Sequence, residues 1–159
     1  MKKFIYLLLV SVFTIAFTAC SDDDEPEMKV KVNIQNNGKE INNNDVITYN
    51  AEADVFGEFV AGPVSDPSIK TSEPCKLEVS ITIPENELDY IQWCGIDHAC
   101  LDYRESGTFT RSNDKAQNEA MEMHAHFKAG VYTSCKVKVD VKVNDKPVRT
   151  FYIEYVYAG

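Results

Sequence analysis

The chain has 159 residues, of which 44% are hydrophobic, and it carries a formal net charge of −9 at pH 7. This length suits one domain with a real apolar core and leaves too little sequence for two. We expect no nucleic-acid partner and no adhesion to anionic lipid, because both require a positive protein surface.

The N-terminus has the order of a secretory signal. Lys2 and Lys3 form a basic head, and the apolar run that ends at Phe17 is shorter than the ~20 residues that span a bilayer. The next three residues, Thr18-Ala19-Cys20, resemble the end of a bacterial lipoprotein signal, in which the cysteine receives lipid. The resemblance implies that residues 1–19 are cleaved and that Cys20 is lipidated. An ordinary secretory signal followed by a structural cysteine is the alternative.

An acidic string follows the cysteine. Residues 21–27 contain five carboxylates and one proline and offer no apolar face, so residues 20–27 are predicted to form an extended tether. The string resembles the export signal of Bacteroidetes-type surface lipoproteins. This resemblance implies a protein of the outer membrane that is exposed at the cell surface and held in the membrane by its lipid anchor. Residues 28–159 then form the single domain.

Apolar and polar residues alternate in this domain and no segment has helical periodicity, so the sequence predicts an all-β fold. Many short strands separated by Gly, Pro and Asn turns are typical of a sandwich or barrel. The expected strands are Met28–Ile34, Val46–Asn50, Ala53–Val60, Cys75–Ile83, Tyr90–Cys94, Thr108–Arg111, Met121–Phe127, Cys135–Val143 and Arg149–Tyr157.

The last two strands are predicted to form a hairpin with a defined register. The odd-numbered residues of Val137–Val143 face inward, and so do Phe151, Ile153, Tyr155 and Tyr157. Matching odd to odd residues needs an odd number of loop residues, because a one-residue slip turns a strand inside out. A two-residue Asn144-Asp145 turn is therefore excluded unless a bulge intervenes. A three-residue loop places Val139 opposite Phe151, and a five-residue loop places Val141 there.

Four further cysteines follow Cys20, at positions 75, 94, 100 and 135. An even number in an exported protein indicates two disulfides, for which three pairings are possible. Structural zinc is the alternative, but Cys94 and Cys100 have no second close-spaced cysteine pair to complete a site.

The order of three residues gives a more specific resemblance. Cys75 opens one inward-facing strand, Trp93 lies on the next, and Cys135 opens a later one, which resembles the Cys-Trp-Cys order of immunoglobulin domains. Tyr132 stands three residues before Cys135, whereas the family has its tyrosine two before. The resemblance implies an Ig-like antiparallel β-sandwich with the disulfides Cys75–Cys135 and Cys94–Cys100. It implies no function, because such sandwiches host many.

Glu122, His124 and His126 alternate with apolar residues and so share one face of a strand. Two imidazoles and a carboxylate are ligands of transition metals, which makes these residues candidates for a metal site. Haem is another candidate ligand of the histidines. The plainer interpretation is the polar outer face of a strand.

The loop from Cys94 to Cys100 is the candidate binding site. A disulfide would hold it as a rigid tip that presents His98 beside Trp93 and Tyr103, and preorganised loops lose little entropy on binding. A stapled turn that covers the core is the plainer interpretation.

The sequence contains no Gly-x-Ser-x-Gly motif and no phosphate-binding glycine loop, so we expect no catalytic residues and no cofactor. The predicted function is a non-enzymatic binding or accessory module of the cell envelope, with a protein or a glycan as the possible partner. A metal- or haem-capturing lipoprotein and a carbohydrate-binding lipoprotein are the alternatives.

Overall fold

The computed structural model describes residues 29–51, 55–56, 59–128 and 130–158. The predicted signal peptide, Cys20 and the acidic tether lie outside these residues. The described chain forms strands and no helix, so it contains no apolar helix that could cross a membrane. The strands are β1 (Val32–Asn36), β2 (Lys39–Glu40), β3 (Val46–Asn50), β4 (Val55–Phe56), β5 (Phe59–Ser65), β6 (Ser68–Ile83), β7 (Leu88–Gly95), β8 (Ala99–Tyr103), β9 (Gly107–Lys128), β10 (Thr133–Val143) and β11 (Lys146–Tyr157).

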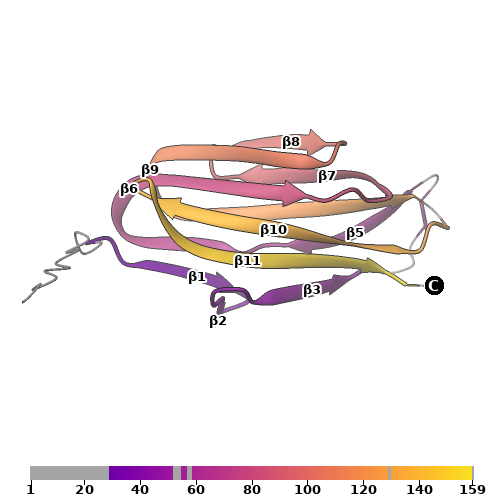
Figure 1. The fold of residues 1–159 in the computed structure, drawn as a ribbon, viewed down its shortest axis with the longest axis horizontal. Helices are drawn as coiled ribbons and strands as arrows, with labels where there is room; N and C mark the ends of the chain where they lie inside the picture. The colour runs from indigo at the N-terminus through magenta and orange to yellow at the C-terminus, as the bar shows by residue number, and fades with distance from the viewer. Residues whose placement is uncertain (1–28, 52–54, 57–58, 129, 159) are drawn as a thin grey trace, which may run out of the picture.

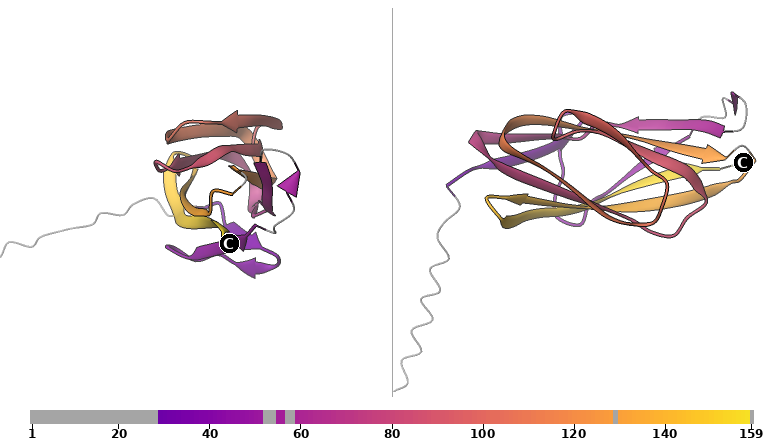
Figure 2. Two further views of the ribbon diagram at one scale, coloured as in Figure 1. Left: turned by 90° about the vertical axis from the view of Figure 1, so that its right-hand side faces the viewer. Right: turned by 90° about the horizontal axis from the view of Figure 1, so that it is seen from above.

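The strands form two layers that share their longest strand. The first layer has the order β3-β11-β10-β6-β9, with the β1–β2 hairpin paired to the start of β6. The second has the order β4-β5-β9-β7-β8. Residues 107–120 of β9 pair with β6, residues 121–127 pair with β7, and residues 123–128 pair with β5 on the other side. β6 and β9 turn around the same end of the sandwich (Figure 1), and the two curved layers enclose the core (Figure 2). The prediction of an all-β sandwich is confirmed.

The core is built by the predicted alternation of side chains. Residues 75–83 of β6 and 135–143 of β10 are buried at every odd position. The inward set of β11 is also confirmed, because Phe151, Ile153, Tyr155 and Tyr157 are all buried. Tyr155 brings its hydroxyl into this core, where it lies 2.6 Å from the Ser65 hydroxyl, so the buried polar group is satisfied.

The β10–β11 hairpin uses the exception that the sequence left open. Its turn is the two-residue Asn144-Asp145, and a bulge after Val141 restores the phase. Val139 consequently lies opposite Phe151. Both turn residues have positive φ, 49° and 65°, as the common two-residue hairpin turn requires.

Several elements differ from the prediction. β9 is one strand of 22 residues where the sequence predicts two short ones, and β6 begins at Ser68. β2 and β8 are not among the expected strands, and the expected strand Ala53–Val60 falls on β4 and on β5, which continues to Ser65. The polar residues 112–120 lie where β9 passes between the layers, and register shifts accompany their pairing with β6. Alternation is weak there because few of these side chains face a core, although Ala116 and Glu119 are buried. A further difference is that β3 pairs with β11 in parallel.

The predicted Cys75–Cys135 disulfide is wrong. β6 and β10 are antiparallel neighbours in one layer, with Val143 opposite Leu77 and Val139 opposite Ile81. The two cysteines therefore lie at opposite ends of the pair, about 30 Å apart at ~3.3 Å per residue, whereas a disulfide needs Cα atoms within about 7 Å. Both thiols are buried and free. Burial raises the pKa of Cys135 to about 12, so its thiol is protonated and unreactive at neutral pH.

Candidate functional site

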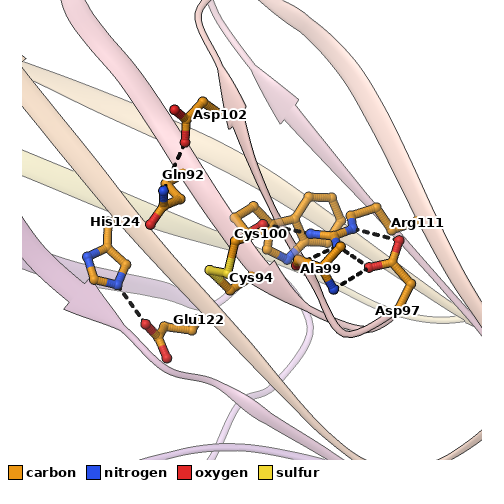
Figure 3. The surroundings of a disulfide bond; sticks show 10 residues. Gln92, Cys94, Asp97, Ala99, Cys100, Asp102, Arg111, Glu122 and His124 are labelled. Atoms are coloured by element: carbon orange, nitrogen blue, oxygen red, sulfur yellow. Dashed lines mark hydrogen bonds and ion pairs between the residues drawn. A yellow bond between two sulfur atoms is a disulfide. The ribbon is translucent and has the colours of Figure 1, made fainter.

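The β7–β8 hairpin carries the predicted binding loop. Cys94 and Cys100 are direct partners across the two strands, and they form a disulfide with a Cα–Cα distance of 4.1 Å. Figure 3 shows the surroundings of this bond. The predicted pairing of these two cysteines agrees with the structure. The disulfide closes a loop whose three turn residues are Ile96, Asp97 and His98.

The turn presses against β9. Gly95 has φ of 102°, and a Cβ added there would lie 2.1 Å from the Ala120 carbonyl oxygen, so only glycine fits. Ile96 also has positive φ, 56°, and its side chain is fully buried. A β-branched residue rarely adopts this conformation, so burial of Ile96 in the core holds a backbone that local preference disfavours.

A buried guanidinium locks the hairpin from the other layer. Arg111 of β9 is 4% exposed, and it donates to the carbonyl oxygens of Trp93 and Ala99, at 2.6 Å each. It also makes a bidentate ion pair with Asp97 in the turn. The Arg111 guanidinium lies 5.1 Å from the Trp93 ring and holds the pKa of Asp97 below its usual range. The hairpin is thus fixed at both strands and at its tip.

These contacts decide the roles of the three predicted binding residues. Trp93 is fully buried beneath Arg111, so it contributes to the core, and its binding role stays a prediction. Tyr103 is half-buried and packs with its ring 4.4 Å from Phe109 and 6.1 Å from Trp93, which makes it part of the core edge. His98 is exposed at the tip with φ of 62°. Of the three, only His98 is presented to solvent by the rigid turn.

The disulfide faces outward, on the same side as the predicted metal ligands (Figure 3). On this outer face, Gln92 donates to Asp102 at 3.0 Å, and the His124 Nε2 atom lies 2.7 Å from the Glu122 carboxylate. Glu122, His124 and His126 do share one face of β9, as predicted. This contact engages two of the three with each other.

An aromatic stack continues this outer face. The His126 ring lies flat on Tyr90 at 4.0 Å, and the Arg104 guanidinium lies 4.7 Å from the same Tyr90 ring. Burial, and secondarily the positive charge on His124, lower the pKa of His126. The imidazole of His126 therefore prefers its neutral form, in which it packs as an aromatic ring.

Within the described ranges, no three His, Cys, Asp or Glu side chains are grouped closely enough to hold a metal ion. Glu122 and His124 reach each other along the strand, whereas the His126 ring is stacked on Tyr90. A third ligand from a neighbouring strand would be needed. The register instead places Gln92 and Val64 beside His124.

The clamp residues Arg111 and Asp97 were missed by the sequence prediction. Arg111 follows Phe109 at an inward position of its strand, and a charged residue on the apolar face is a signal for a buried ion pair. The partner could not be identified from the sequence, because Asp97 reaches Arg111 only through the docking of one layer on the other.

Known proteins resemble this chain in fold but not in sequence. The chain matches no protein-family model, and no curated protein resembles its sequence. The N-terminal domain of PorA is similar in structure, with a TM-score of 0.61 at 12% identity, over 81% of this chain and 98% of that domain. Weaker likenesses are a cohesin from Archaeoglobus fulgidus (TM-score 0.42, 12% identity, 81% and 92% covered) and a family 123 glycoside hydrolase from Clostridium perfringens (0.48, 12%, 83% and 28%).

The likeness to the PorA domain extends over most of both chains and concerns the fold alone. Together with the two layers, in which every described strand pair except β3–β11 is antiparallel, it shows the fold class of an Ig-like β-sandwich, as predicted. The two weaker scores support no conclusion about ligands or activity.

Proposed function

We propose that the protein is a lipid-anchored, non-enzymatic binding or accessory module of the cell envelope, displayed at the surface of the outer membrane. The observation that carries the binding role is the locked β7–β8 hairpin. Its disulfide, the buried Arg111 and the buried Ile96 fix the turn, so a partner that contacts His98 need not order the loop first. The anchor rests on the lipoprotein-like signal that ends at Cys20.

The fold is compatible with this display. β1 begins at one end of the long axis, and the C-terminus lies at the other (Figure 1). An anchor at Cys20 would thus hold the β1 end toward the membrane. Eight tether residues would reach at most about 29 Å if fully extended, so the domain would remain close to the bilayer.

Metabolic labelling tests the anchor. Labelled fatty acid is expected in the wild-type protein and absent from Cys20→Ala. Neutralising Asp22, Asp23, Asp24 and Glu25 is expected to leave a labelled protein that added protease no longer reaches on whole cells. An unlabelled wild-type protein of mature length would refute the anchor.

Site-specific crosslinking tests the binding role. A photoreactive amino acid at His98 is expected to give a discrete adduct on living cells. The same group at Glu105, which is also exposed but lies outside the hairpin, serves as the matched control. Equal or absent adducts at the two positions would refute a binding role for the hairpin.

A further inference from the structure

A different surface, independent of the hairpin and of the anchor, lies at the edge of the first layer. β3 is the outermost strand there and, among the described strands, pairs only with β11. In this parallel register, Ile47 and Tyr49 direct their main-chain N–H and C=O groups to β11. The main-chain groups of Val46, Thr48 and Asn50 therefore point away from the sheet.

β3 lacks the features that usually block such an edge. Natural edge strands carry charged residues, proline or bulges, which prevent pairing with another chain. β3 reads Val-Ile-Thr-Tyr-Asn, with no charge and no proline, and its five residues pair with β11 without a register shift. Its inward residues are held in the sandwich, since Tyr49 packs on Tyr155 at 6.1 Å. The edge is thus rigid, uncharged and rich in β-branched residues.

A cleft lies beside the start of this edge. It has a volume of about 380 Å³, and its walls are the β1–β2 hairpin and residues 45–48. The Glu40 carboxylate in this wall is 3.8 Å from the Arg149 guanidinium, and Asp45 accepts the Asn42 N–H at 2.7 Å. The Lys39 ammonium forms no ion pair with any described residue. Among the described residues, the cleft therefore offers one unpaired cation, Lys39, that a partner could use, and it also contains the Asp45 carboxylate, one oxygen of which is taken up by the Asn42 N–H.

We propose that β3 accepts an extended segment of another polypeptide as an added strand, with uncharged side chains along β3 and a carboxylate beside Lys39. Main-chain hydrogen bonds to Val46, Thr48 and Asn50 would supply affinity, and the cleft would supply selectivity. The size of the surface favours a segment over a second folded copy. Stable interfaces between folded proteins use about 20–30 residues on each side, far more than β3 and its cleft provide.

Thr48→Pro removes the outward N–H at the centre of the edge and leaves the hydrogen bonds of Ile47 and Tyr49 to β11 in place. Thr48→Val keeps that N–H and is the matched control. A display library of random decapeptides is selected on the full-length protein in detergent. Peptides with alternating β-branched residues and one acidic residue are expected. Their affinity for Thr48→Pro should be at least tenfold lower than for the wild type, and their affinity for Thr48→Val should be within twofold of the wild-type value.

Lys39→Gln is expected to lower the affinity of the acidic peptides several-fold. Equal melting temperatures of the wild type and the variants would show that the fold is intact. Peptides that bind Thr48→Pro as well as the wild type would overturn the proposal, and so would a library without enrichment. Analytical sedimentation tests the other possible occupant of the edge, a second copy of this chain. A wild-type dimer that Thr48→Pro dissociates would show that a second copy occupies the edge and would also overturn the proposal.

Discussion

The clamp between Arg111 and Asp97 makes a quantitative prediction. Asp97→Asn removes the carboxylate and leaves the Arg111 guanidinium buried, with an exposed fraction of 3% in its side chain. Breaking a buried ion pair costs about 3–5 kcal/mol, whereas surface pairs contribute about 0–1 kcal/mol. The Asp97 side chain is 38% exposed, so we expect an intermediate loss of about 2 kcal/mol in the free energy of unfolding. For a domain of this size the melting temperature falls by about 8 °C.

Urea unfolding of a double-mutant cycle measures this loss. Arg111→Met removes the charge but leaves the Trp93 and Ala99 carbonyl oxygens without their donor, at about 1–3 kcal/mol each. In that background Asp97→Asn is expected to cost under ~0.5 kcal/mol, because no buried cation remains to be neutralised. Asp102→Asn, on the exposed face, is the control. An equal cost of Asp97→Asn in both backgrounds would refute the clamp.

Three further predictions concern the cysteines and the tight turn at Gly95. Replacing Cys94 and Cys100 by Ser is expected to cost about 2 kcal/mol of unfolding free energy in urea, and an unchanged midpoint would contradict it. Gly95→Ala is expected to destabilise the domain more than Gly38→Ala, because both glycines have positive φ but only at Gly95 would the new Cβ collide with a carbonyl oxygen. Equal melting temperatures of the two variants would refute this steric argument. Cys75 and Cys135 should react with a thiol reagent only after unfolding, and a peptide joining the two in non-reducing mass spectrometry would disprove their free state.

The sequence was sufficient for the parts of the fold where side chains alternate strictly. Every second residue is apolar over residues 75–83 of β6, 135–143 of β10 and 151–157 of β11, and a two-residue period places all of these on one face. The inward face of β11 followed from that period alone, whereas the register of the last hairpin remained open between Val139 and Val141 opposite Phe151. The pattern allowed the bulge after Val141, which sets Val139 opposite Phe151, but could not choose it.

Strand order required information that alternation does not contain. Cys75 and Cys135 have the same phase in their strands, and phase is compatible with facing layers as well as with neighbours in one layer. The neighbouring antiparallel arrangement separates the two cysteines and overturns the disulfide. The same limit applies to the candidate site: contacts that are local in sequence could be predicted, and contacts between the layers could not. The Cys94–Cys100 pair is local in sequence, whereas the burial of Trp93 beneath Arg111 depends on how the layers dock.

The outer face of β9 gives a last prediction, for the pH dependence of stability. Burial is the main cause that lowers the pKa of His126, and the charge on His124 adds to it; Arg104 acts in the same direction, while Asp89 and Asp102 oppose it. A histidine whose pKa is lower in the folded state binds its proton more readily in the unfolded chain.

The contribution of His126 to stability is therefore complete above the unfolded pKa of about 6.5 and is lost as the pH falls through the lower folded value. Urea unfolding at pH 7, 6 and 5 is expected to show a decline for the wild type. His126→Phe keeps a ring that can stack on Tyr90, and His126→Gln keeps a polar side chain. Both should flatten the decline, because neither can bind the proton. A decline of the same size in both variants would show that another group is responsible.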